Sequence, residues 1–226
     1  MIAPGGDGGD GTNDPRSPAL RKRKRLRKEE IVAEATRLFA ERGYEGTSMG
    51  DLAESVGLRK ASLFHHFESK DVLYAAVLAQ LLDDVRSAIA TAIAAEGSFV
   101  DRLDALTDAL ITMLGAQPHA ARLLIREAMD WGPVMRDGEL AAQSQAVLTA
   151  GVEFARAGQK DGVFNPALDP IQLVITLVGV YLIPFVVDRT VEGLAGVSPF
   201  EGPFIEERRL ALREQIRRLV LITPAT

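Results

Sequence analysis

Cysteine is absent from the 226-residue sequence, and only three histidines and one tryptophan are present. The lack of cysteine excludes disulfides, thiolate nucleophiles and cysteine-based metal sites. The N-terminus has no apolar segment of the signal-peptide kind. The longest apolar run, 171–187, includes Gln172, Thr176 and Pro184, and it falls short of the roughly 20 residues of a comfortable bilayer span. We therefore expect a cytoplasmic protein with no membrane partner.

No segment alternates apolar and polar residues as a strand does, so the sequence predicts an all-α fold. Apolar residues make up 47% of the chain, which is enough for a sizeable core. The net charge of −5 argues against a nucleic-acid partner, but the charge is unevenly placed. Residues 21–71 hold 12 Lys and Arg against 9 Asp and Glu, whereas residues 72–226 hold 13 against 19. A basic end on an acidic remainder fits one charged partner bound at that end.

The N-terminal residues divide into two parts by composition. Residues 1–20 are rich in Gly, Asp and Pro, which predicts a disordered tail. Residues 21–28 form a basic arm with seven cations in eight residues, which we expect to stay extended through self-repulsion. By composition alone, this arm is either a solvated, solubilising segment or a contact to DNA phosphates or the minor groove.

The first predicted helix has a single apolar face. Its apolar residues recur at i, i+4, i+7 and i+8: Ile31, Ala35, Leu38 and Phe39. Gly43 ends this helix. Ser48 is then expected to cap a second, short helix with Asp51 as its acidic partner, and Gly57 permits the tight turn that follows.

A third helix is predicted near 60–67, where it buries Leu63 and Phe67. Ser69 caps a fourth helix that runs from Lys70 to about Ala95, roughly 39 Å at ~1.5 Å per residue. A helix of this length should join a small N-terminal domain to the rest of the chain. The further predicted helices lie near 99–116, 119–130, 138–158, 170–187 and 204–222.

Two short helices joined by a glycine turn form a helix-turn-helix, whose second helix enters the major groove. The surrounding residues match a known pattern in register: Lys28-Glu29-Glu30-Ile31, Leu38-Phe39, Gly43-Tyr44, Thr47-Ser48-Met49, Asp51-Leu52-Ala53, Val56-Gly57-Leu58, Ser62-Leu63-Phe64-His65-His66-Phe67 and Ser69-Lys70-Asp71-Val72-Leu73. Residues 28–78 thus resemble the N-terminal domain of the TetR family of transcriptional regulators.

The resemblance implies a role for each matching polar residue. Thr47 and Ser48 would contact phosphate at the start of the second helix, and Lys70 would do so at the start of the fourth. Base edges would be reached from the start of the third helix, by Arg59, Lys60 and Ser62. His65 would contact the DNA backbone or a base, whereas His66 would support packing.

Two positions depart from the family pattern. Phe64 stands where the family usually has a tyrosine whose hydroxyl reaches a phosphate, so Phe64 is expected only to pack. Arg59 stands where a small capping residue is common, which suggests that it reaches DNA. Because the basic arm directly precedes the first helix, the resemblance also favours DNA contact by the arm, with Arg23, Arg25 and Arg27 as the contact residues.

The C-terminal part matches the family only in architecture, which implies a helical bundle for ligand binding and dimerisation. The residues predicted to line an apolar pocket there are Met113, Arg126, Met129, Trp131, Phe154 and Tyr181. For any one of the apolar residues, ordinary core packing is the alternative. His119, Arg122 and Arg126 share one helix face, which is either exposed surface, the favoured interpretation, or an anion site at the pocket mouth.

The predicted organisation is a tail at 1–20, the basic arm at 21–28, a helix-turn-helix domain at 28–75 and a ligand-binding and dimerisation domain at 76–226. The resemblance implies a homodimer through the two C-terminal helices, which would form a four-helix bundle across the two subunits.

The predicted function is a ligand-responsive regulator, a repressor that leaves a palindromic operator when a small, largely apolar inducer binds; a corepressor is the other possible small-molecule partner. The alternatives are an architectural or non-ligand-gated DNA-binding protein and, less favoured, a helical-bundle enzyme. The sequence has no Ser/His/Asp grouping, Gly-rich phosphate loop or metal-ligand spacing. We therefore expect no enzymatic activity, no cofactor and no metal.

Overall fold

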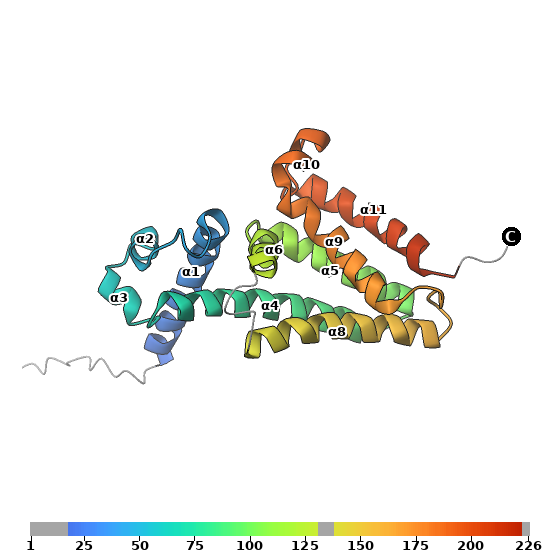
Figure 1. Cartoon of the computed structure of the whole chain (residues 1–226), viewed down its shortest axis with the longest axis horizontal. Coiled ribbons are helices and arrows are strands. Elements are labelled where there is room, and N and C mark those ends of the chain that lie inside the picture. The colour runs from blue at the N-terminus through green and yellow to red at the C-terminus, as the bar shows by residue number, and fades with distance from the viewer. Residues whose placement is uncertain (1–17, 131–137, 223–226) are drawn as a thin grey trace, which may run out of the picture.

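The computed structural model describes residues 18–130 and 138–222, which form ten helices (Figure 1). They are α1 (Pro18–Arg42), α2 (Met49–Ser55), α3 (Lys60–Phe64), α4 (Lys70–Ala94), α5 (Phe99–Ala116), α6 (Ala120–Asp130), α8 (Glu139–Lys160), α9 (Pro170–Val186), α10 (Asp188–Ala195) and α11 (Gly202–Val220). Across the described residues, β-structure is limited to one isolated bridge between Phe164 and Leu221. The predicted all-α fold is confirmed.

The first three helices and the start of α4 surround one core, to which Ala120 and Leu123 of α6 also contribute. We call α1–α3 together with residues 70–81 of α4 the head, and the remaining helices with the rest of α4 the body. The predicted apolar stripe of α1 faces the head core, since each of its four residues is at most 1% exposed. Leu52 of α2 and Leu63 of α3 are buried in the same core.

Local signals set the ends of α2 as predicted. The Oγ atom of Ser48 accepts the backbone N–H of Asp51 at 3.2 Å, and the Asp51 carboxylate accepts the N–H of Ser48 at 2.9 Å. Gly57 then has a φ of +63°, a conformation that a β-carbon would disfavour. This residue lets the chain turn sharply between α2 and α3.

The basic arm is helical, which corrects the expectation of an extended segment. α1 begins at Pro18 and includes residues 21–28 as well as the last three residues of the predicted tail. Three features explain the difference: the buried residues from Ile31 onward anchor the helix, Lys and Arg favour helix formation, and proline suits a first helical position. The predicted tail residues 1–17 lie outside the described part of the chain.

α3 ends at Phe64, three residues earlier than predicted. After it the chain turns, buries Phe67 and places Ser69 as the cap of α4, where its Oγ accepts the N–H of Val72 at 3.2 Å. The 25 residues of α4 agree with the predicted helix and extend about 37 Å. Figure 1 shows α4 running from the head into the body.

The other predicted helices agree with α5, α6, α8, α9 and α11 to within two residues at each end. In the body, α11 packs on α5 through three ion pairs that the sequence did not predict, and one of them joins Arg209 to Asp108 at 3.5 Å. Arg213 donates from Nε to Asp108 at 2.7 Å, and Arg217 donates from Nε to Asp104 at 3.0 Å. These charged pairs hold α11 in one register on α5.

The segment after α9 departs from the prediction, and the end of α9 itself contains a proline. Pro184 has no N–H, which leaves the carbonyl of Val180 without its helical partner, and Arg208 of α11 donates to that carbonyl from Nη2 at 3.1 Å. Beyond Val186 the chain forms α10, which the sequence analysis missed. No single helix among the described residues has the length and hydropathy of a membrane span, and α9 with α10 meets those criteria only as a pair bent by 78°.

Candidate DNA-binding surface and ligand cavity

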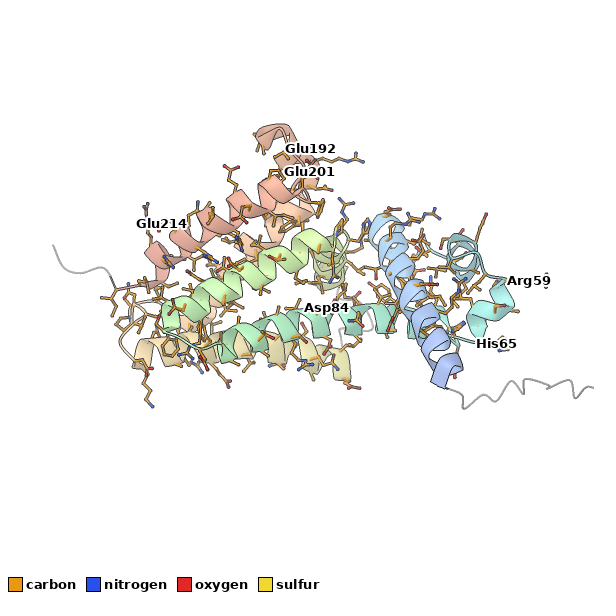
Figure 2. The ribbon with its side chains drawn as sticks, turned by 180° about the vertical axis from the view of Figure 1, so that it is seen from behind. Arg59, His65, Asp84, Glu192, Glu201 and Glu214 are labelled. Atoms are coloured by element: carbon orange, nitrogen blue, oxygen red, sulfur yellow. The ribbon has the colours of Figure 1, made fainter. Side chains whose placement is uncertain are left out.

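The outer side of α3 carries the exposed polar groups of the head. Figure 2 shows Arg59 and His65 at the end of the head that faces away from the body. Four side chains of this helix and its C-cap are exposed: Lys60, Ala61, Phe64 and His65. Leu63, on the opposite side, is fully buried. The burial of Leu63 therefore turns the cationic side of α3 outward.

Phe64 and Arg59 are the two residues in and beside α3 that depart from the family pattern in sequence. Phe64 is 41% exposed, so it is not restricted to packing, which corrects the expectation from sequence. Arg59 is the N-cap of α3 and makes no side-chain cap hydrogen bond, as its side chain predicts. Ser62 and His66 are half-buried beside the exposed face.

Thr47 has a structural position that the sequence analysis did not foresee. It is 1% exposed, and its Oγ1 donates to the carbonyl of Gly43 at 2.9 Å. A hydroxyl buried in this way cannot reach a phosphate, which corrects the predicted contact. Ser48 is exposed at the start of α2, with its Oγ engaged by Asp51, so its contact with phosphate stays a prediction.

Lys70 lies at the start of α4 and is held by Tyr44. Its Nζ donates to the carbonyl of Tyr44 at 2.9 Å and lies 4.0 Å from the centre of the Tyr44 ring. The Tyr44 hydroxyl donates to Asp71. Burial raises the pKa of Tyr44 to about 12, with the Asp71 hydrogen bond as the next cause. Tyr44 thus remains a neutral donor that orients the predicted phosphate contact of Lys70.

The described end of the basic arm is also held by the head. Arg27 donates from Nη2 to the carbonyl of Val56 at 2.8 Å and from Nη1 to Glu30 at 2.7 Å. Arg27 thereby fastens α1 to the turn between α2 and α3. The side chains of Arg23 and Arg25 lie outside the described part of the structure, so DNA contact by the arm stays a prediction.

The body holds a partly open apolar cavity of about 230 Å³. Residues of α4, α5, α6, α8, α9 and α11 line it, and among the described ones only Ser144 and Tyr181 have an oxygen or nitrogen atom in the side chain. Burial raises the pKa of Tyr181 to about 12, and its hydroxyl lies 3.0 Å from Oγ1 of Thr107. The described lining is uncharged and almost entirely hydrocarbon.

The predicted pocket residues separate into three groups. Met113, Phe154 and Tyr181 line the cavity. Arg126 and Met129 are not in its lining, and Met129 is 78% exposed; these two assignments are corrected because α6 turns Leu124 and Ala128 toward the cavity instead. Trp131 lies outside the described residues.

His119, which precedes α6, and Arg122 and Arg126 of α6 do not line the cavity. Arg122 pairs with Asp188 of α10 at 2.9 Å. The Arg126 guanidinium lies against Gly43, where an added β-carbon would be 2.6 Å from Nη1. Burial lowers the pKa of His119, which lies near carboxylates of α1. All three side chains are half-buried, so the face is not simply exposed surface: His119 and Arg126 lie against the head, and Arg122 pairs within the body.

A buried hydrogen bond also joins α6 to the head. The Tyr74 hydroxyl of α4 donates to Oε2 of Glu127 at 2.6 Å, and Glu127 is 3% exposed. Its second oxygen, Oε1, has no hydrogen-bond partner among the described residues. The sequence analysis missed this pair, although Glu127 stands four residues after the buried Leu123, where an acidic side chain is unexpected.

The glycine turn, the capped α2 and the outward-facing α3 define a helix-turn-helix DNA-binding protein. Two family models match the chain: bacterial regulatory proteins of the tetR family over residues 31–77, and the tetracyclin repressor-like C-terminal domain over residues 100–217. The second match covers more than half of the chain. The chain therefore belongs to the TetR family of DNA-binding transcriptional regulators, which are transcription factors and not enzymes.

Individual relatives agree with this assignment. The biofilm operon icaADBC negative transcriptional regulator IcaR of Staphylococcus aureus (strain Newman) is 49% identical over 47 residues, which are 21% of this chain and a quarter of IcaR (25%).

Solved structures extend the likeness to most of the fold. KstR2 of Mycobacterium tuberculosis, a ketosteroid transcriptional regulator, has a TM-score of 0.72 at 18% identity over 87% of this chain and 96% of its own. PfmR of Thermus thermophilus has a TM-score of 0.70 at 23% identity over 88% and 98%. At these identities the likeness shows the fold alone.

Proposed function

We propose that this regulator is a homodimeric repressor that leaves its operator when a small, largely apolar molecule binds in the body. The observation that carries the proposal is the cavity of about 230 Å³ beside α6. One side of α6 lines this cavity, while Ala120 and Leu123 of the same helix belong to the head core. A change in the cavity therefore acts on a helix that the head also contacts.

The apolar lining of the cavity limits the polarity and charge of a ligand that can bind there. Placing an unpaired charge in an apolar cavity is costly, and the described lining offers no charged partner. The part of the ligand that enters is thus uncharged, with at most one or two hydrogen-bonding groups near Ser144 or Tyr181. The isovaleryl coenzyme A and operator DNA complex of AibR, a structure with a TM-score of 0.65 at 21% identity, is an example in this fold of one protein that binds both kinds of partner.

A chain of contacts leads from the cavity to the predicted DNA contact at Lys70. Leu124 and Ala128 line the cavity on either side of Glu127, which accepts the Tyr74 hydroxyl. The ring of Tyr74 lies 4.9 Å from that of Tyr44. Tyr44 in turn holds Lys70. A ligand that shifts α6 would alter this chain, and about 1.4 kcal/mol of coupling is enough for a tenfold loss of operator affinity.

Exposed apolar side chains on the last helices support the homodimer. They are Ile171, Ile175 and Ile183 of α9 with Leu210 and Leu219 of α11. A second copy of the chain would bury them and would present one recognition helix per subunit. Such a dimer binds a near-palindrome with half-sites about 34–36 Å, or a multiple, apart. Repression is supported by the match of the head to IcaR, which is named a negative regulator.

The test begins with selection of bound sequences from random DNA, which should recover a palindrome. Neutral probes, a series of fatty-acid methyl esters and sterols, are then titrated against the protein bound to labelled operator. A probe that releases DNA should bind less tightly to the DNA-bound protein by the same factor. Ala155→Leu, which fills the cavity from a buried lining position, should abolish this release.

The matched control is Ala146→Leu, an exposed alanine on the same helix, which should leave release unchanged. Probes that bind the wild type but leave operator affinity unchanged would instead indicate a DNA-binding protein that no ligand controls. Recovery of a single asymmetric half-site bound by a monomer would contradict the dimer.

A further inference from the structure

Phe64 is an apolar group on the surface that meets DNA. The residue is 41% exposed, and it shares the outer side of α3 with the exposed residues Lys60, Ala61 and His65. The buried Leu63 precedes it and holds α3 against the head core. Phe64 is therefore partly exposed to solvent on a helix that Leu63 anchors.

The surface of DNA offers few partners for such a ring. Phe64 has no hydrogen-bond donor, so it cannot bond to phosphate oxygens, for which Arg59, Lys60 and His65 are the suitable groups on the same surface. Along the base edges of the major groove, the apolar group is the C5-methyl of thymine. An exposed ring on the groove-entering helix gains most when it covers that methyl group, because both surfaces then leave water.

We propose that Phe64 determines specificity by recognising a thymine methyl group in each operator half-site. The inference goes beyond DNA binding as such, because it assigns one side chain to one chemical group of one base. It also separates Phe64 from Lys60: the ring selects A·T pairs through an apolar contact, and the amine selects through hydrogen bonds. Phe64 touches DNA in this proposal and takes no part in the ligand response.

The experiment uses the full-length protein and the operator recovered by selection. Each symmetric pair of thymines is replaced in turn by deoxyuracil, which removes only the methyl groups and keeps the base pairing. At one of these pairs, the affinity of the wild type should fall about fourfold for each half-site, which is the factor that corresponds to the burial of one methyl group. For the dimer, which contacts both half-sites, the loss should be about fifteenfold. Phe64→Ala should respond less than twofold to the same replacement.

Two further variants make the result decisive. Phe64→Leu keeps an apolar side chain and should retain part of the response to deoxyuracil, and Val72→Ala, which truncates an exposed apolar residue of α4, should retain all of it. Equal responses of wild type and Phe64→Ala at every thymine pair would overturn the proposal and move any methyl contact to Ala61. A second pair of results would also overturn the proposal: no effect of deoxyuracil on the wild type, and tighter binding of Phe64→Tyr to both operator and random DNA. Together these results would place the ring at the phosphate backbone.

Discussion

The head and the body differ in how their buried side chains are arranged. In the head, Leu38, Phe39 and Leu63 are at most 1% exposed, and the rings of Phe39 and Tyr74 meet edge to face with their centres 4.9 Å apart. In the body, large side chains of six helices surround a cavity of about 230 Å³. A well-filled core holds the recognition helix in one position, whereas an unfilled one leaves room for a ligand to change the packing.

The two regions also depend on contacts of different range. The turn and the cap in the head involve residues within a few positions of each other, as in the Ser48–Asp51 pair. The body is joined by pairs such as Arg213 with Asp108, which are 105 residues apart. The helix-turn-helix motif thus rests mainly on local structure, and the proposed sensing rests on how distant segments meet.

The largest effect is expected from a void in the head core. Leu63→Ala should lower the free energy of unfolding by about 2–5 kcal/mol and abolish operator binding, because the full head cannot fill the space. Leu106→Ala, at the wall of the existing cavity, should cost less, since its side chain already lacks some neighbours. Urea denaturation of both variants checks this, with Leu63→Met as the conservative control. Equal costs would mean that the two cores are packed alike.

A second prediction separates base reading from phosphate contact within the head. Lys60→Ala should lose about 1–3 kcal/mol of discrimination between operator variants if Lys60 reads a base. Lys70→Ala, which removes the cation held by Tyr44, should weaken binding to all sequences alike. Affinities for a set of single-base operator variants distinguish the two. A uniform loss in both variants would assign base reading to Arg59, Ser62 or His65.

A third prediction tests the hydrogen bond that joins the regions. Tyr74→Phe leaves the Glu127 carboxylate buried without this donor, which should destabilise the protein by about 1–3 kcal/mol and reduce the effect of a releasing probe on operator affinity. Glu127→Gln keeps an acceptor for the Tyr74 hydroxyl and should retain more of that effect. Probe titrations against labelled operator measure both. An unchanged ligand response in Tyr74→Phe would remove this bond from the proposed path.

The smallest effect is expected from the loss of a helix cap of a kind that occurs in both the head and the body. Ser98 and Asp101 cap α5 in the same way as Ser48 and Asp51 cap α2. Ser48→Ala and Ser98→Ala should each cost about 1 kcal/mol of stability. Only Ser48→Ala should weaken operator binding, if Ser48 contacts phosphate. Equal operator affinities in the two variants would limit Ser48 to capping.

The same caps predict a pH dependence with a definite sign. Hydrogen bonds from the serine side chain, and then from its backbone N–H, hold the pKa values of Asp51 and Asp101 below their usual range. A carboxylate with a lowered folded-state pKa stabilises the protein above its unfolded pKa of about 3.9, and the stabilisation is lost as the pH falls through the folded value. The serine variants should therefore lose less stability than the wild type below about pH 4.

Most of the head could be predicted from the sequence because the features that define it involve residues close together in the chain. The stripe from Ile31 to Phe39, the cap at Ser48 and the glycine turn each involve neighbouring residues, and all three occur as expected. The outward position of Lys60 and His65 follows from the helical period once Leu63 is placed inside. The burial of Thr47 was not predicted, because its hydroxyl turns inward to the carbonyls of Gly43 and Leu38, and the loop after α1 sets that direction.

By itself, the sequence determined the all-α fold, most helix boundaries and the DNA-binding motif, since hydrogen bonds within helices and apolar periodicity act over a few residues. Only the tertiary structure decided that Thr47 is buried, that Arg126 turns toward the head and that Leu124 lines the cavity. The same holds for the pairing of Tyr74 with Glu127 across 53 residues. Such features depend on which face of each helix packs against another, and that choice is set by the whole core and not by any one segment.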